Sequence, residues 1–179
     1  MDAASPPLSE IVVPATLFGD LRAALESEAG PLAAVHALHA AGYAAGVAAA
    51  PALRTSPGEN VLALPQDVFW TRLAAFFARR GWGSLIHAPA HPAVGLLNSP
   101  DWAEGATPGG EDASCSFTAG FLSGMLSTLA GGPVAVLEIS CRARGDGHCS
   151  FAFGNAVAVH DLYGKLVQGS DVPGALASL

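Results

Sequence analysis

The sequence predicts an α+β fold in which helices pack on an antiparallel sheet of about four strands. Apolar residues recur with helical spacing over much of residues 14–80 and again over 114–130. Short apolar runs bounded by Pro and Gly follow each of these helical parts. A chain of 179 residues suits one core, so we expect a single domain over 14–179, preceded by a flexible leader at 1–13.

The first half of the chain is predicted to hold three helices, at residues 14–30, 31–51 and 65–81. Pro at the start and Gly at the end of these segments are the usual boundary residues. Gly42 and Gly46 lie four residues apart in the second helix, on one face. We therefore expect another helix to approach the second helix closely at that face.

The second half is predicted to combine strands with two further helices. Residues 98–113 are rich in Gly, Pro, Asp and Glu and are expected to form a loop with solvated acids, among them Asp101 and Glu104. Gly120 and Gly124 give the helix that follows a face small enough for close packing. The expected elements are a hairpin of strands at 84–88 and 93–97, a helix at 114–130, strands at 134–141 and 149–153 joined by a tight turn, and a helix at 157–168.

Composition excludes several partner classes. The net charge is −7 with only eight Lys and Arg, which argues against a surface for nucleic acid or anionic lipid. The start of the chain lacks a basic segment followed by a leucine-rich core, so we expect no secretory signal and a cytoplasmic protein. The most apolar stretch, residues 32–53, is mostly Ala, which favours a buried helix over a membrane span.

Three cysteines are an odd number for disulfides and direct attention to metal chemistry. Cys141 and Cys149 flank a turn that would bring their thiols together, and Cys115 lies at the start of a helix, where a thiolate is favoured. Three thiolates leave one of the four zinc positions open. The alternative is that these cysteines are ordinary buried packing residues.

Glu138 is the first candidate for the fourth position. It lies inside the apolar run VAVLEI, where a buried carboxylate is costly unless it is paired or bound to metal. Glu138 and Cys141 are three residues apart, so a regular strand would point them to opposite faces and a bulge or strand end near Ser140 is required. His148, next to Cys149, is the alternative fourth ligand.

From residue 98 onward the chain resembles the 4-vinyl-reductase domain family, found in aromatic-sensing activators and bacteriochlorophyll-biosynthesis proteins. The resemblance rests on NSPDWAEG and on CSFTAGFLSGMLSTLAGGPVAVLEISCRARGDGHCSF, and it is strongest over residues 98–153. It implies a structural Zn²⁺ held by Cys115, Glu138, Cys141 and Cys149. It also implies a fold like that of trafficking-complex subunits, often a homodimer through the N-terminal helices.

A hydrophobic pocket between sheet and helices is the expected ligand site. In phenol sensors of this family a Trp and a His hold the ligand hydroxyl, and Leu96 occupies the position that we align with that Trp. No His lies near Val68, so a larger or less polar ligand than phenol is expected. His36, His39, His87 and His91 are polar groups that could orient a ligand, and the ligand-binding residues that we predict are Phe69, Phe76, Trp82, Leu96, Trp102, Phe117 and Phe121.

The function predicted from these features is a zinc-containing sensor or carrier domain for a hydrophobic or aromatic small molecule. The sequence shows no nucleophile with a paired base and no nucleotide-binding glycine motif, so we expect no catalytic residues. The first alternative is an accessory or reductase-type protein in tetrapyrrole 4-vinyl chemistry. The second is a homodimeric interaction adaptor.

Overall fold

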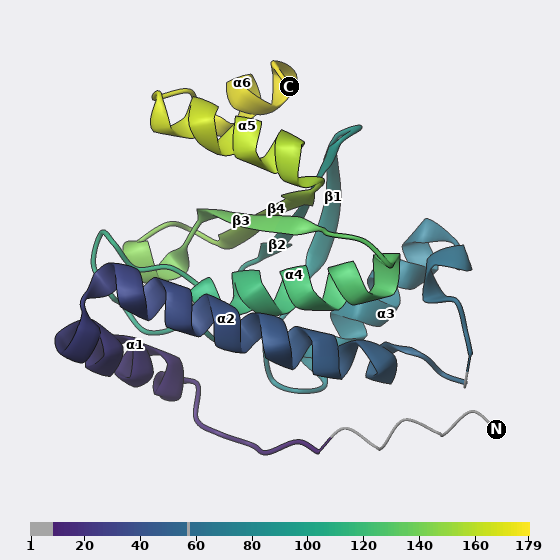
Figure 1. Cartoon of the computed structure of the whole chain (residues 1–179), viewed down its shortest axis with the longest axis horizontal. Coiled ribbons are helices and arrows are strands. Elements are labelled where there is room, and N and C mark those ends of the chain that lie inside the picture. Colours follow the sequence, from purple (N-terminus) through teal and green to yellow (C-terminus); the bar gives the residue numbers. More distant parts are fainter. Residues whose placement is uncertain (1–8, 57) are drawn as a thin grey trace.

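The computed structural model describes residues 9–56 and 58–179 (Figure 1). The leader predicted at 1–13 therefore lies largely outside the described residues, and 9–14 have no regular secondary structure. The elements are α1 (Thr16–Ala29), α2 (Pro31–Ala49), η1 (Ala50–Leu53), η2 (Val61–Ala63), α3 (Gln66–Ala78), β1 (Ile86–His91), β2 (Val94–Ser99), α4 (Ser116–Ala130), β3 (Ala135–Ser140), η3 (Arg142–Arg144), β4 (Cys149–Gly154), α5 (Ala156–Val167) and α6 (Val172–Ala177).

The four strands form one antiparallel sheet in the order β1-β2-β4-β3, which confirms the predicted fold class. The helices α2, α3 and α4 lie on one side of this sheet and α5 and α6 on the other (Figure 1). Alternation along the strands supplies both layers, because neighbouring side chains point to opposite faces. Leu97 and Phe151 belong to the large core under α3 and α4, whereas Leu96 and Ala152 belong to the smaller core under α5 and α6.

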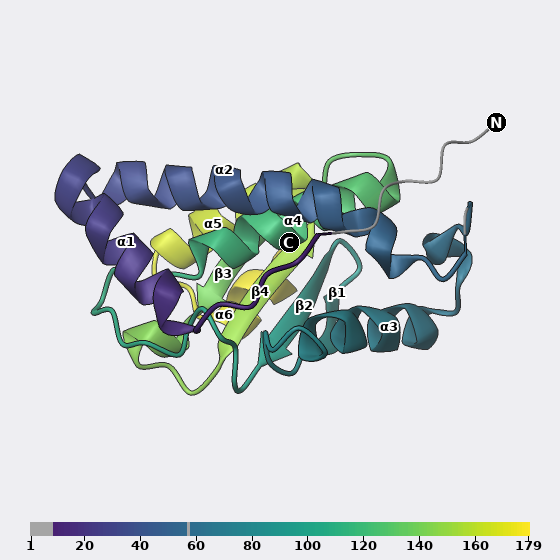
Figure 2. The ribbon, with the colours of Figure 1, turned by 90° about the horizontal axis from the view of Figure 1, so that it is seen from below.

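Helices α2 and α4 run side by side with their backbones in contact (Figures 1 and 2). A Cβ built on Gly42 would lie 2.0 Å from the carbonyl oxygen of Phe117, and one on Gly46 the same distance from that of Phe121. The contact is reciprocal, since a Cβ on Gly120 would lie 2.1 Å from the carbonyl oxygen of His39. The close approach predicted from both glycine pairs is confirmed.

The structure differs from the predicted elements in three places. Strand β1 continues through Pro89, which the sequence places in a turn; β1 is an edge strand, where a residue without an N–H is tolerated. The connection from β3 to β4 contains the short helix η3 in place of a tight turn. Helix α6 is absent from the predicted elements; its N-terminus is capped by Asp171, whose carboxylate accepts a hydrogen bond from the Gly174 amide at 2.8 Å.

Within the part of the chain that the structure describes, one segment has the length and composition of a membrane-crossing helix. This segment, Pro31–Leu53, has a mean hydropathy of 1.3 over its most apolar window, and core helices of soluble proteins meet the same criterion. In the structure its glycine face packs against α4.

Candidate metal centre and ligand pocket

Three sulfurs and one carboxylate converge at the N-terminal end of α4. The ligand atoms of Cys115, Glu138, Cys141 and Cys149 all lie within 4.8 Å of one another, and the three cysteines are buried. The Sγ atom of Cys115 is 3.7 Å from that of Cys141 and 3.8 Å from that of Cys149. Sulfur ligands at the usual Zn–S distance of about 2.3 Å lie about 3.8 Å apart in a tetrahedron, whereas disulfide sulfurs lie about 2.05 Å apart.

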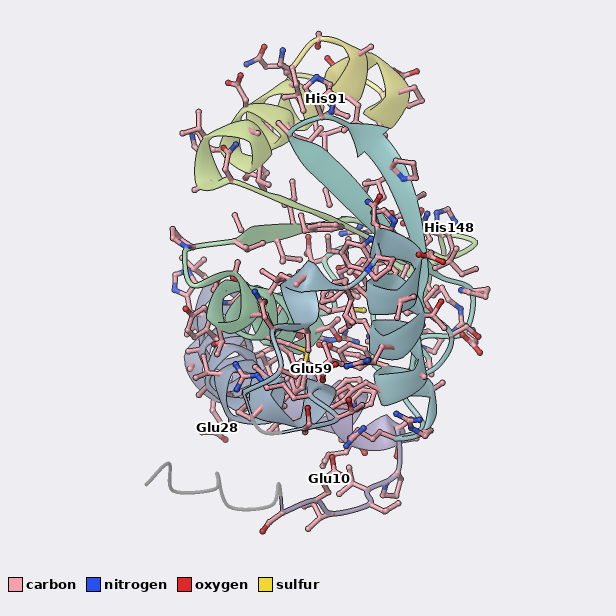
Figure 3. The ribbon with its side chains drawn as sticks, turned by 90° about the vertical axis from the view of Figure 1, so that its right-hand side faces the viewer. Glu10, Glu28, Glu59, His91 and His148 are labelled. Atoms are coloured by element: carbon pink, nitrogen blue, oxygen red, sulfur yellow. The ribbon has the colours of Figure 1, made fainter. Side chains whose placement is uncertain are left out.

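The chain reaches this arrangement through an irregular end of β3. The register of β3 against β4 shifts between Glu138 and Ser140, and the strand ends at Ser140. Cys141 follows in extended conformation, and so it reaches the same side as Glu138. This is the irregularity that the three-residue spacing required. His148 is exposed and lies outside the cluster (Figure 3), so of the two candidates Glu138 is the one at the sulfurs.

Glu138 has the environment of a metal ligand. Its Oε2 accepts a hydrogen bond from the Cys115 amide at 2.8 Å, whereas its Oε1 is buried and has no hydrogen-bond partner. Burial, followed by repulsion from Cys141, raises the pKa of Glu138 to about 8. A buried oxygen without a donor beside three sulfurs is a site that a dication would satisfy.

The thiols are coupled to one another. Hydrogen bonds to Cys141 and Cys149, together with burial, raise the pKa of the Cys115 thiol. The same sulfur contacts lower the pKa of Cys149, and the Arg142 amide donates to Cys149 Sγ at 3.5 Å. One thiolate is thus favoured and a second is disfavoured by its neighbours, a balance that a bound cation changes because metal binding displaces thiol protons. The donor set fits a zinc ion of the structural type, with four protein ligands.

Glu104 is a buried carboxylate, so the prediction that it is a solvated loop acid is wrong. It is 4% exposed and accepts hydrogen bonds from the Phe117 amide at 3.0 Å, the Thr118 amide at 2.7 Å and the Thr118 hydroxyl at 2.5 Å. These amides belong to the first turn of α4, whose positive end favours an anion. Burial nevertheless raises the pKa of Glu104 to about 7. The loop composition hid this role, and nothing in the spacing of its acids distinguishes Glu104.

Most of the predicted ligand-binding aromatic residues meet in one cluster. Trp82 stacks on Phe117 with ring centroids 6.0 Å apart, and it lies 5.7 Å from Trp102 and 5.9 Å from Phe121. Trp102 is fully buried, and its indole N–H donates to the Thr118 hydroxyl at 2.7 Å. The hydrogen bond between Trp102 and Thr118 joins the aromatic cluster to the first turn of α4.

The other predicted ligand-binding residues lie apart from this cluster. Phe76 is buried at the edge of it, packed against Phe77 with ring centroids 5.2 Å apart. Leu96 faces the opposite side of the sheet, under α5 and α6, because it is one residue out of phase with Leu97. Phe69 lies near the N-terminal end of α3 and lines a separate pocket. The aligned position alone did not reveal which face of β2 carries Leu96.

An apolar pocket of about 310 Å³, hereafter the α3–α4 pocket, opens beside Phe69. Trp70 also lines it; its ring stacks on His87 at 4.1 Å between centroids, and its indole nitrogen is buried with no hydrogen-bond partner. Burial lowers the pKa of His87. The lining residues come from η2, α3, α4, the start of β3 and β4: Leu62, Leu64, Gln66, Phe69, Trp70, Leu126, Ala130, Val134 and Phe153.

The four histidines named from the sequence do not gather at this pocket. His87 is the one that contacts it, through Trp70. His36 is exposed on α2, and His91 lies at the far end of the hairpin (Figure 3). His39 lines a shallow pocket beside Cys115 and Glu138, and burial lowers its pKa.

Comparison with known proteins identifies the part of the chain around the cluster. The family model of the 4-vinyl-reductase domain matches residues 103–155, which include all four residues of the cluster. A search of curated protein sequences gives no match.

Several solved structures share the fold. The phenol-responsive sensory domain of the transcription activator PoxR, crystallised with phenol, has a TM-score of 0.69 and 17% identity, covering 90% of this chain and 84% of that one. A vinyl-4-reductase family protein from Methanocaldococcus jannaschii has a TM-score of 0.53 and 18% identity over 81% and 83%. A trafficking protein particle complex subunit 3 from Naegleria fowleri, covalently bound to palmitic acid, has a TM-score of 0.59 and 14% identity over 78% and 91%. At these identities the likeness concerns the fold.

Proposed function

Because residues 103–155 match the 4-vinyl-reductase domain model, we propose that this chain is a small-molecule-binding domain, a sensor or carrier for a hydrophobic or aromatic ligand. The domain extends over 14–179, and a structural zinc ion at Cys115, Glu138, Cys141 and Cys149 holds it together. The observation that carries the proposal is the α3–α4 pocket, an apolar space of ligand size beside the sheet.

The lining of this pocket indicates the kind of ligand. Carbon side chains dominate, and Gln66 supplies the polar group at its edge. A volume of 310 Å³ is near the lower end for small-molecule sites, of about 300 to 1,000 Å³, and suits one or two aromatic rings better than a tetrapyrrole. We therefore favour a fused-ring aromatic compound over phenol and over the tetrapyrrole alternative.

Relatives of the same fold support a hydrophobic ligand. The PoxR domain was crystallised with phenol, and the Naegleria subunit carries palmitic acid. Covalent attachment through sulfur does not extend to this chain, because all three of its cysteines belong to the metal cluster. We propose that Phe69 contacts the ligand directly and that the cluster of Trp82, Trp102, Phe117 and Phe121 backs the site.

The metal centre has a supporting role in this proposal. Four protein ligands fill a tetrahedral zinc and leave no position for a reacting water, so we propose a structural ion and no hydrolytic chemistry. Its position explains why it matters: it ties the start of α4 to β3 and β4, and α4 also lines the pocket.

We also propose a homodimer through α1 and α2. Both helices present apolar side chains to solvent, including Leu32 at 69%, Leu17 at 43% and Leu21 at 41% exposed. A contiguous apolar surface of this kind is typical of a protein interface. The adaptor alternative needs the same surface and differs in leaving the α3–α4 pocket without a ligand.

A thermal-shift series tests the ligand proposal. We expect 2-naphthol and naphthalene to raise the melting temperature of the purified protein more than phenol does, because they bury more apolar area. The variant Ala130→Phe places a ring at the mouth of the pocket from an exposed position, so it should remove the shift and leave the unliganded melting temperature nearly unchanged.

The matched control is Ala177→Phe, an exposed Ala to Phe change on α6, which should keep the full shift. Equal shifts for Ala130→Phe and the wild type would place the ligand elsewhere. No shift with any of the three compounds, together with a stable protein partner, would favour the adaptor.

A further inference from the structure

A second cavity lies under the N-terminal segment, on a different part of the molecule from the α3–α4 pocket. It has a volume of about 440 Å³ and shares no lining residue with that pocket. We call residues 9–12 the strap and this space the strap cavity. The strap lies along it, and the remaining lining comes from α2, the end of α3, Trp82 and α4: Ala45, Ala48, Ala49, Phe76, Arg79, Arg80, Trp82 and Phe121.

The strap covers the cavity without filling it. Ile11 is 87% exposed and Val12 is 102% exposed, so their side chains point to solvent although the segment lines the cavity. The contact that holds the strap is an ion pair between the Glu10 carboxylate and Nε of Arg80. Figure 2 shows the strap (dark purple) running from the start of α1 toward the C-terminal part of α2, and Figure 3 shows Glu10 on it.

Arg80 is held in a fixed orientation at the rim. Its Nη1 donates to the Phe76 carbonyl at 2.9 Å, and its Cζ lies 3.7 Å from the centroid of the Phe76 ring. These two contacts use one side of the planar guanidinium and leave Nε directed at a carboxylate. The Arg80 side chain is 25% exposed, so its charge is partly withdrawn from water. A preoriented guanidinium beside an apolar cavity is the recognition element for a carboxylate on an apolar body.

We propose that the strap cavity binds an aliphatic carboxylate of medium chain length, and that Glu10 is a built-in competitor for the same guanidinium. The ligand carboxylate takes the place of Glu10 on Arg80, and its hydrocarbon chain lies against Phe76, Trp82 and Phe121. Binding is noncovalent and releases the strap. The inference does not depend on an aromatic ligand in the α3–α4 pocket.

Octanoate and 1-octanol form the decisive pair of probes, because they share a hydrocarbon chain and differ in the carboxylate. Calorimetric titration of the full chain should give an affinity for octanoate about tenfold higher than for octanol, the effect of one charge-assisted hydrogen bond. Emission from Trp82 should change on binding, since that side chain lines the cavity. The variant Trp82→Phe identifies its contribution among the three tryptophans.

Two substitutions separate the charges. Arg80→Gln should lower octanoate affinity about tenfold and bring it to the level of octanol, and Arg80→Lys should fall between. Glu10→Gln removes the competitor and should tighten octanoate binding about two- to fivefold, with octanol unaffected, in line with a partly exposed ion pair. Arg54→Gln, at an exposed arginine away from the cavity, is the matched control and should change neither affinity.

Three outcomes would overturn the inference. These are equal binding of octanoate and octanol by the wild type, loss of octanoate affinity in Glu10→Gln, and loss of octanoate binding in Ala130→Phe, which would put the acid in the α3–α4 pocket. If Arg80→Gln unfolds, Glu10→Gln still decides, because Glu10 lies on an exposed segment outside the core. Octanoate binding that survives Ala130→Phe while naphthol binding is lost would support two separate sites.

Discussion

The two ends of α4 are built on different physical principles. At its N-terminal end Cys115 joins the sulfur cluster, and Glu104 accepts the first-turn amides of Phe117 and Thr118. Directional contacts fix these groups. At its C-terminal end Leu126 and Ala130 face the apolar α3–α4 pocket of 310 Å³. Substitutions at the first end should therefore act on folding, and substitutions at the second should act on which molecule binds.

The largest effect is expected at the cluster. Cys141→Ser removes one of three sulfurs, and structural zinc contributes on the order of 10 kcal/mol to folding, comparable with the whole stability of a domain. The variant should lose its metal and accumulate as insoluble protein, as judged by metal analysis and solubility on expression. A soluble Cys141→Ser protein that melts like the wild type would contradict a structural role for the cluster.

The buried carboxylate gives the next effect. Glu104→Ala leaves the Phe117 and Thr118 amides and the Thr118 hydroxyl buried without an acceptor, so we expect a loss of about 3 kcal/mol in unfolding free energy. Urea unfolding measures it. Glu111→Ala, at an exposed acid of the same loop, should change stability by less than about 0.5 kcal/mol. Similar values for both variants would mean that Glu104 does not anchor α4.

The middle of α4 tests the helix contact that links its two ends. Gly46→Ala forces a methyl group against the carbonyl oxygen of Phe121 and should destabilise the protein by about 1 to 3 kcal/mol. Gly164→Ala is the control: it lies within α5 with nothing within 4 Å of a built Cβ, and it should stabilise by about 0.5 to 1 kcal/mol. Opposite signs in urea unfolding are the predicted result, and equal destabilisation would count against the backbone contact.

The smallest effect on stability is expected at the pocket. Leu62 is 48% exposed and lines the α3–α4 pocket, so Leu62→Ala should cost less than about 1 kcal/mol while enlarging the space. Its ligand preference should move toward larger ring systems, measured as the ratio of affinities for anthracene and naphthalene. An unchanged ratio with intact folding would show that Leu62 does not limit ligand size.

The same contrast explains what could be predicted from the sequence. The cluster was predictable because Glu138 is out of place in an apolar strand and because three cysteines need a common partner. The α2–α4 contact was predictable because glycine pairs four apart mark a helix face. Glu104 and Leu96 were not: the first depends on how a loop folds back onto α4, and the second on the phase of one strand. Both are tertiary properties that local spacing does not record.

The central claim is that a metal ion joins α4 to the β3–β4 hairpin, and elemental analysis of the purified chain tests it most directly. We predict one zinc ion per chain that resists dialysis and is lost, together with the folded state, on treatment with a strong chelator. Folded protein that contains no metal and melts unchanged in the presence of chelator would contradict the claim.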